Sequence, residues 1–240
     1  MIYKWARDVS AAIVRVDGGV DWRNAKMTPG EDDPAALSAG KAIAEASGGE
    51  VVGLTIGDGD ASWVLARGVQ QAFSVSDAMS LPDNAATAAI LAAAVGRIGD
   101  VDVVAIGDSK QDPGVAPALA GLLGWPVIVG LVSATAEDGR VVAIRRAGNT
   151  QETFSIAPPV VLAMAAESEM ATTPGMKELL AARKRPLTQV TVADLGLDVA
   201  EVVTSRGTQK PDVTPARVFE GEPVAVAEQL LSALRAEGVL

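Results

Sequence analysis

The sequence has 240 residues, of which 49% are hydrophobic and 3% aromatic, so one α/β domain with an Ala, Val, Leu and Ile core is expected. It contains no Cys and no His, which excludes disulfides, zinc–thiolate sites and the Ser-His-Asp and Cys-His triads. The net charge of −10 argues against a nucleic-acid surface, because such a surface needs a positive field.

The first half of the chain alternates helices with short apolar strands. It is expected to begin with a short strand at Met1–Trp5, a hairpin around Asp17-Gly18-Gly19 and a loop at 24–33. The predicted helices are Pro34–Ser47, Ala61–Gln71, Asn84–Ile98 and Val115–Leu123. The predicted strands are Glu50–Gly57, Asp77–Leu81 and Val101–Ile106.

After Val127 the pattern changes to strand-like runs that are joined by turns. These runs are expected to add antiparallel strands to the sheet: VIVGLVSA, GRVVAIRR, ETFSIA and PVVLAMAA. A helix is expected at Met176–Arg183, an irregular arm at Leu187–Phe219 and an amphipathic helix at Pro223–Glu237.

Strands that alternate with helices predict an α/β fold, with a doubly wound, mostly parallel sheet, antiparallel additions and a C-terminal arm. We expect two parts, a nucleotide-binding α/β domain at 1–186 and an arm with a helix at 187–240. No apolar run reaches the ~18 residues of a membrane span. MIYKWARD has no apolar stretch of signal-peptide length, so a cytoplasmic protein without membrane insertion is expected.

The stretch VAIGDSKQDPGVAP places a polar loop between a strand and a helix. It matches neither G-x-x-x-x-G-K-[ST] nor G-x-G-x-x-G. The loop Asp108–Gly114 precedes the free N–H groups of a helix, which favour an anion. Two interpretations stay open at this point, a site for a nucleotide phosphate and an ordinary turn of a doubly wound sheet.

Two charged runs also have two interpretations. Arg183-Lys184-Arg185 is either a docking patch or a set of cations that the C-terminal end of a helix favours. Glu31-Asp32-Asp33 is expected to be charge at a helix N-terminus, because a Ca²⁺ site needs more oxygen ligands at a fixed spacing. No metal site is expected.

Several stretches resemble, in order, the beta subunit of electron transfer flavoproteins. YKWARD is similar to the family's V-K-x-V-P-D, and DVVAIG through VAPALAGLLGWP is similar to D-L-V-L-L-G … Q-V-G-P-x-L-A-x-L-L-G-W-P. The other similar stretches are GGEVVGLTIG, PPVVLAMAAE, TPGMKELLAARKRPL, VTVADLGL and FEGEPVAVAEQLLSALRAEGVL. The sequence also departs from the family: the loop after Gly107 is shorter and Gly114 replaces a Gln, Gly30 replaces an asparagine before the first helix, the first strand starts late, and Thr173 replaces a leucine.

The resemblance implies a Rossmann-like, adenine nucleotide alpha hydrolase-like domain that pairs with an alpha subunit in a heterodimer. FAD would be held mostly by the alpha subunit, and the beta subunit would bind AMP. The complex would shuttle electrons from flavin dehydrogenases to an acceptor, which makes this chain an electron carrier subunit rather than an enzyme by itself. The missing His and Cys fit, because the flavin supplies the redox chemistry.

Carried over position by position, the resemblance implies a nucleotide pocket and a docking region. The pocket residues would be Ile2, Gly30, Asp33, Ile56, Gly57, Gly107, Asp112, Gly114, Val115, Ala116 and Pro117. A flavin dehydrogenase would dock on Thr173–Arg185. Two other hypotheses stay open, a flavin-bifurcating beta subunit with a second FAD and a stand-alone adenine-nucleotide-binding protein of the stress type.

Overall fold

The computed structural model describes residues 1–57, 59–78, 83–110, 112–165, 174–198, 203, 206 and 215–240. The chain divides into two compact units, Met1–Ile13 with Asp21–Gly207, and Val14–Val20 with Thr208–Leu240. The large unit contains a sheet with helices packed on it. The small unit contains the C-terminal helix α6, Pro223–Ala236.

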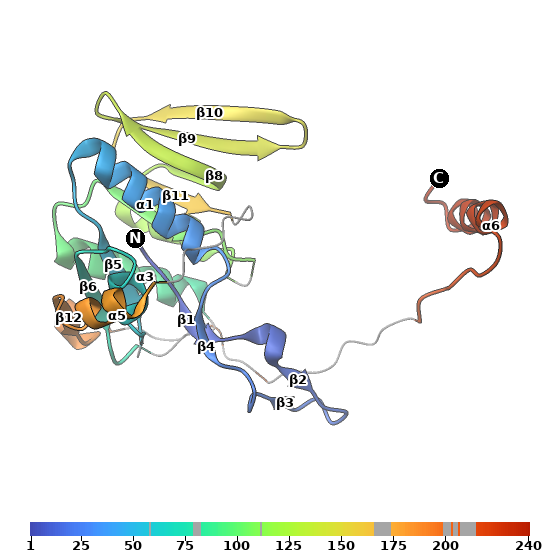
Figure 1. The fold of residues 1–240 in the computed structure, drawn as a ribbon, viewed down its shortest axis with the longest axis horizontal. Coiled ribbons are helices and arrows are strands. Elements are labelled where there is room, and N and C mark those ends of the chain that lie inside the picture. Colours follow the sequence, from blue (N-terminus) through green and yellow to red (C-terminus); the bar gives the residue numbers. More distant parts are fainter. Residues whose placement is uncertain are drawn as a thin grey trace. The chain divides into compact units, whose positions relative to one another are not determined.

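The large unit is built on two groups of hydrogen-bonded strands, in the orders β10-β9-β8-β11-β7 and β12-β6-β5 (Figure 1). The strands are Val52–Ile56 (β5), Gln71–Val75 (β6), Val103–Gly107 (β7), Val127–Glu137 (β8), Arg140–Ala147 (β9), Thr150–Ile156 (β10), Val160–Met164 (β11) and Leu187–Val190 (β12). Strand β11 is parallel to β7 and β8, and β6 is parallel to β5 and β12. Strands β9 and β10 are antiparallel additions, so the predicted α/β fold is confirmed.

The first three residues connect the two groups of strands. Ile2 pairs with Leu54 of β5 in a parallel bridge, and its N–H donates to the carbonyl of Ala105 in β7 at 2.8 Å. The N–H of Tyr3 donates to the Leu54 carbonyl at 3.0 Å. The N-terminal segment therefore lies between β5 and β7, as a central strand would.

The helices cover both faces of the sheet. On one face, α1 (Asp33–Ser47) packs on β7, β8 and β11. On the other face, α3 (Asn84–Ile98) and α4 (Val115–Leu123) pack against each other. Successive residues of β11 point to opposite faces, so Leu162 joins the α1 core while Val161 joins the core beneath α3 and α4.

The predicted helix at Ala61–Gln71 is wrong over most of its length. Only Ser62–Leu65 is helical (α2), and the chain turns at Gly68, whose φ is +99°. The next residues form β6, a strand that the sequence analysis missed. The strand predicted at Asp77–Leu81 is not formed at 77–78, and its remaining residues lie outside the described part of the chain.

The observed strand pairing shows that three other predictions of secondary structure were wrong. The run PVVLAMAA, expected to be antiparallel, contains the buried parallel strand β11. The loop at 24–33 contains β4 (Met27–Pro29), which pairs with β1 (Trp5–Arg7). The arm predicted from Leu187 begins with β12, which pairs with β6.

The remaining elements are short. They are a 3-10 turn at Val9–Ala11, the paired strands Ile13–Val14 (β2) and Val20–Asp21 (β3), helix α5 (Met176–Ala182) and a 3-10 turn at Ala193–Leu195. Within the residues that the structure describes, no helix combines the length and the apolar character that a membrane crossing requires.

Candidate functional site

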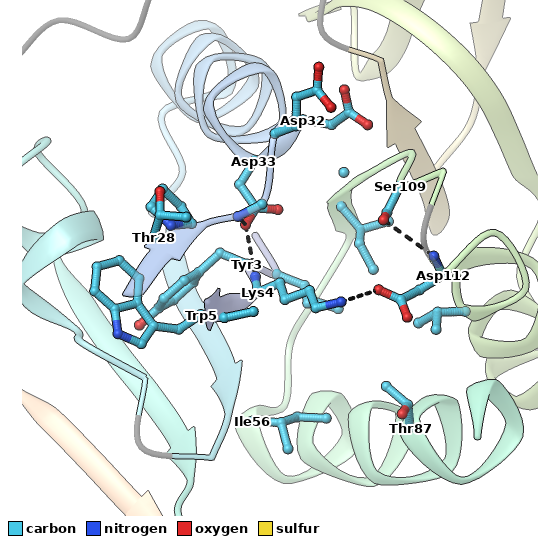
Figure 2. A pocket seen from close by; sticks show the side chains of 18 of the residues that line it. Tyr3, Lys4, Trp5, Thr28, Asp32, Asp33, Ile56, Thr87, Ser109 and Asp112 are labelled. Carbon is cyan, nitrogen blue, oxygen red and sulfur yellow. Dashed lines mark hydrogen bonds and ion pairs between the residues drawn. The ribbon is translucent and has the colours of Figure 1, made fainter. Parts of the chain in front are cut away.

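A cavity of about 580 Å³ opens at the carboxyl ends of β5 and β7, beside the N-terminal segment (Figure 2). The chain passes from the N-terminal segment to β5 on one side and later to β7 on the other, so the strand order reverses here. Ligands of open α/β sheets bind at such points, because the two loops diverge and leave a crevice. Fold topology alone therefore makes this cavity the candidate site.

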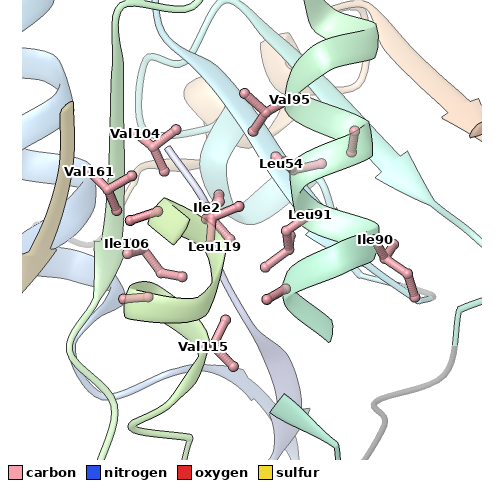
Figure 3. Close-up of a cluster of buried hydrophobic side chains, with 14 of the residues drawn as sticks. Ile2, Leu54, Ile90, Leu91, Val95, Val104, Ile106, Val115, Leu119 and Val161 are labelled. Atoms are coloured by element: carbon pink, nitrogen blue, oxygen red, sulfur yellow. The ribbon is translucent and has the colours of Figure 1, made fainter. Parts of the chain in front are cut away.

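One wall of the cavity is apolar and belongs to the hydrophobic core beneath α3 and α4 (Figure 3). The side chains shared by cavity and core are Ile2, Ile90, Leu91, Ile106 and Val115. They are held by the packing of the sheet against two helices, so this wall exists before any ligand binds. A planar apolar group would find a rigid surface here.

The opposite side of the cavity is organised by the carboxylate of Asp33, the first residue of α1. Its Oδ2 accepts the backbone N–H of Lys4 at 2.8 Å and that of Gly30 at 2.7 Å. The Asp33 N–H in turn donates to the Gly30 carbonyl at 3.2 Å. This carboxylate therefore fixes the end of the N-terminal segment to the loop before α1.

Burial raises the pKa of Asp33 to about 7, although the two backbone N–H groups pull it down. The neighbouring Asp32 raises it further, and the charge of Lys4 lowers it. Gly107 makes this arrangement possible, because a Cβ at that position would lie only 3.0 Å from Asp33 Oδ1. Any other residue at this position would require the Asp33 carboxylate or the adjacent Asp32 to move aside by a few tenths of an ångström.

Lys4 extends across the cavity to Asp112 in the loop before α4 (Figure 2). Its Nζ lies 2.5 Å from Asp112 Oδ2, and each of the two side chains is 31% exposed. The N–H of Asp112 is held by the hydroxyl of Ser109 at 3.3 Å. The ion pair therefore joins the N-terminal segment to the β7–α4 loop through the middle of the cavity.

The cavity carries more negative than positive charge. Its basic side chains are Lys4, Arg7 and Lys110. Its acidic side chains are Asp8, Glu31, Asp32, Asp33 and Asp112. No three acidic residues in the described part of the chain are grouped so as to hold a metal ion.

Seven of the pocket residues implied by the sequence resemblance line this one cavity. They are Ile2, Gly30, Asp33, Ile56, Gly107, Asp112 and Val115. They come from four separate segments of the chain, which the sheet topology brings together. Their assignment to nucleotide binding stays a prediction.

The other four residues do not line the cavity. Gly57 faces β6, because its N–H donates a hydrogen bond to the carbonyl of Val75 at 2.8 Å. Ala116 is buried in the core, and Pro117 is exposed in the first turn of α4. Gly114 is the N-cap of α4 and lies next to Asn84, the first residue of α3. A Cβ at Gly114 would lie 2.7 Å from Asn84 Nδ2, so the Gln that the family has here would require Asn84 to move.

The sequence analysis missed several side chains of the cavity, above all Lys4. The stretch YKWARD supported the resemblance, but its Lys4 was not considered as a site residue. Lys4 directly follows Ile2 and Tyr3, at the point where the N-terminal segment leaves the sheet. That position was a usable signal. Thr87 and Ser109 also line the cavity, and they carried no signal, because isolated hydroxyl residues are common in loops and helices.

The predicted docking region is only partly described, since Thr173 lies outside the described residues. Arg185 has a structural role: its Nη1 donates to the carbonyls of Leu65 and Val69, both at 2.6 Å. Arg183 and Lys184 are exposed. The basic run therefore combines one partly buried anchor, Arg185, with two exposed cations, Arg183 and Lys184.

Comparison with known proteins identifies the family. Residues 23–195 match the model of the electron transfer flavoprotein domain. The chain is 30% identical to the electron transfer flavoprotein subunit beta of Mycobacterium leprae (strain TN) over 142 residues, which span 58% of this chain and 53% of that protein. It is 24% identical to the subunit of the same name from Bacillus subtilis (strain 168) over 250 aligned positions, covering 99% of this chain and 97% of that protein. The chain belongs to the electron transfer flavoprotein family, as a divergent relative of its beta subunits.

Proposed function

We propose that this chain is the beta subunit of a cytoplasmic, heterodimeric electron transfer flavoprotein. It binds AMP in the cavity between β5 and β7, and it completes the binding of an FAD that an alpha subunit mainly holds. The heterodimer carries electrons from flavin dehydrogenases to an acceptor. The match to the electron transfer flavoprotein domain supports this function over that of a stand-alone stress-type protein.

The observation that carries the nucleotide proposal is the position and make-up of the cavity. It lies where the strand order reverses, and seven residues that the resemblance assigned to nucleotide binding surround it. Its volume of about 580 Å³ falls within the range of small-ligand pockets. Four distant segments of the chain converge there, as the loops at a crossover point of an α/β sheet do.

The residues present fit AMP in three respects and oppose it in one. The apolar wall around Ile90 and Leu91 suits an adenine ring, and the hydroxyls of Thr87 and Ser109 suit ribose or phosphate oxygens. Lys4 is the cation best placed for a phosphate. The opposing feature is the excess of acidic side chains, above all Asp112, whose carboxylate already contacts that cation.

In the complex, the flavin supplies the redox chemistry when it is bound. This chain contributes binding surface and position. Because it contains no His and no Cys, this chain itself brings neither an imidazole nor a thiol to the cofactor.

Helix α6 supports pairing with an alpha subunit. None of its residues is buried, and its apolar side chains Val226, Leu230, Leu231 and Leu234 recur at helical spacing. A helix with such a stripe is stabilised by burying it against another surface. We assign that surface to the alpha subunit.

Helix α5 supports docking of a flavin dehydrogenase. Its side chains Met176, Leu179 and Leu180 are exposed, Met176 by 73%, and Arg183 and Lys184 follow. Apolar side chains rimmed by cations suit a partner with an apolar pocket and acidic residues around it. Arg185 anchors the base of the helix, so this surface is presented from a fixed point.

The function is tested by co-expressing the chain with an alpha subunit of the same family and identifying the small molecules released on denaturation. One FAD and one AMP per heterodimer are expected. Two FAD would instead indicate the bifurcating alternative. A chain that forms no complex and releases a nucleotide by itself would contradict the proposal in favour of the stress-type alternative.

A further inference from the structure

We propose that Asp112 is an internal competitor for the phosphate site: its carboxylate neutralises Lys4, and an anionic ligand binds by displacing it. This inference rests on the proposed nucleotide function, which it extends to the control of affinity. Asp112 then sets how strongly the cavity distinguishes a nucleotide from the uncharged nucleoside.

The first argument is geometric. The main chain of Lys4 is fixed on both sides, because its N–H donates to Asp33 Oδ2 at 2.8 Å and its carbonyl accepts the Gly30 N–H at 3.2 Å. Only its side chain can move, and it is aimed across the cavity (Figure 2). The partner it meets there is Asp112, at 2.5 Å.

The second argument is electrostatic. Of the three basic side chains that line the cavity, Arg7 and Lys110 are exposed, and Lys4 alone is partly buried. A partly buried cation attracts an anion more strongly than an exposed one, because less water screens it. The strongest attraction available to a phosphate is therefore already engaged by a carboxylate.

The third argument concerns the loop that carries Asp112. Ser109 holds the Asp112 N–H, and the Asp112 carbonyl accepts the N–H of Val115 at 3.2 Å at the start of α4. The backbone at Asp112 is thus hydrogen-bonded on both sides, and Lys4 is the side-chain partner that its carboxylate has. The carboxylate can swing away from Lys4 without unfolding the loop.

These arguments predict opposite effects for the two members of the pair. Asp112→Asn removes a negative charge from the path of the phosphate, so AMP should bind roughly tenfold more tightly. Lys4→Met removes the attracting cation, so AMP should bind roughly tenfold more weakly. Adenosine carries no phosphate, so neither change should alter its affinity more than about twofold.

The test is isothermal titration of the heterodimer with AMP, adenosine and inorganic phosphate. The variants are Asp112→Asn, Lys4→Met and the control Glu45→Gln, which removes an equal charge from an exposed position of α1 outside the cavity. Thermal melts of each variant establish that it is folded. If Glu45→Gln increased the affinity for AMP as much as Asp112→Asn does, the effect would be one of net charge and the inference would be wrong.

The remaining outcomes separate this inference from the proposed function. If the Asp112→Asn variant binds AMP and phosphate more tightly and binds adenosine with unchanged affinity, both the inference and the proposed function are supported. Tighter phosphate binding without any binding of adenosine or AMP supports the role of Asp112 and contradicts the adenine-nucleotide proposal. Weaker or unchanged AMP and phosphate binding by Asp112→Asn contradicts the inference, since Asp112 would then assist the ligand or lie outside its path.

Discussion

Helices α3 and α6 have nearly equal lengths, 15 and 14 residues, and opposite surroundings. Six side chains of α3 are buried, whereas none of α6 is. Helix α3 also has a side-chain cap, because Asp83 accepts the N–H groups of Ala85 and Ala86. Helix α3 is therefore stabilised by packing within the large unit, whereas we propose that an alpha subunit covers the apolar stripe of α6.

This difference separates helices that are stabilised within the large unit from a helix whose apolar side chains are available to a partner. An isolated helix of about 14 residues is marginal in water, so packing must supply most of its stability. For α3 and α4 the sheet supplies that packing. Helix α5 is anchored to the large unit through Arg185 and Ala182, and for α6 we assign the packing to the alpha subunit. Each of the following changes tests one of these assignments.

The largest effect is expected in the packed part. Leu119 of α4 is 0% exposed, so Leu119→Ala should lower the free energy of unfolding by about 2–5 kcal/mol. Leu122 lies on the same helix and is 58% exposed, so Leu122→Ala should cost less than about 0.5 kcal/mol. Urea denaturation of the two variants measures both values, and equal losses would show that α4 is not packed as described.

The second effect is a pH dependence that originates at the cavity. The folded state raises the pKa of Asp33 to about 7 from its ordinary value of 3.8, so folding is favoured by proton uptake between these values. The resulting stabilisation is complete below pH 3.8 and is lost as the pH rises through 7. Between pH 5 and 8, the wild type should lose about 2–3 kcal/mol relative to Asp33→Asn. Denaturation curves across this range check it, and parallel profiles for the two proteins would contradict the burial of this carboxylate.

The third effect concerns the anchor of α5. Arg185→Ala removes a charged donor from the Leu65 and Val69 carbonyls and should destabilise the large unit by about 1.5–3 kcal/mol. Arg183→Ala is the matched control, and at an exposed position it should change stability by less than about 0.5 kcal/mol. Thermal unfolding distinguishes them, and similar small changes would mean that α5 needs no anchor.

The smallest effect on the isolated chain is expected at α6. Leu230→Asp should leave its stability within about 0.5 kcal/mol but weaken the heterodimer at least about tenfold, because it places a charge in the apolar stripe. Gln229→Asp introduces the same charge on an exposed neighbour outside that stripe and should leave the affinity unchanged. Titration of labelled alpha subunit measures both, and a loss of stability in the isolated chain would show that α6 packs within it.

The sequence predicted the elements whose signals are local. The helix α3 was predicted with its observed bounds, since its N-cap Asp83 and terminal Gly99 flank an Ala-rich run. The same holds for α4, which ends at Gly124 in the left-handed conformation. Such termini depend only on neighbouring residues.

The elements that were missed depend on distant residues. Strand β12, with the sequence LTQV, has little apolar content and becomes a strand by pairing with β6, more than a hundred positions earlier. The parallel direction of β11 was also missed, although its continuous apolar run is the pattern of a strand buried on both faces. The cavity illustrates both cases: Asp33 lay at a recognisable helix start, whereas the contact of Lys4 with Asp112 required the folded topology.

The central position of the N-terminal segment has a consequence for how the chain folds. Met1, Ile2 and Tyr3 leave the ribosome before residues 52–54 and Ala105, with which they pair. Strand pairings between distant residues form slowly, and unpaired apolar strands invite aggregation while they wait. The N-terminal segment can therefore join β5 to β7 only after Ala105 has been made, about a hundred positions later, so the two groups of strands are united late in folding.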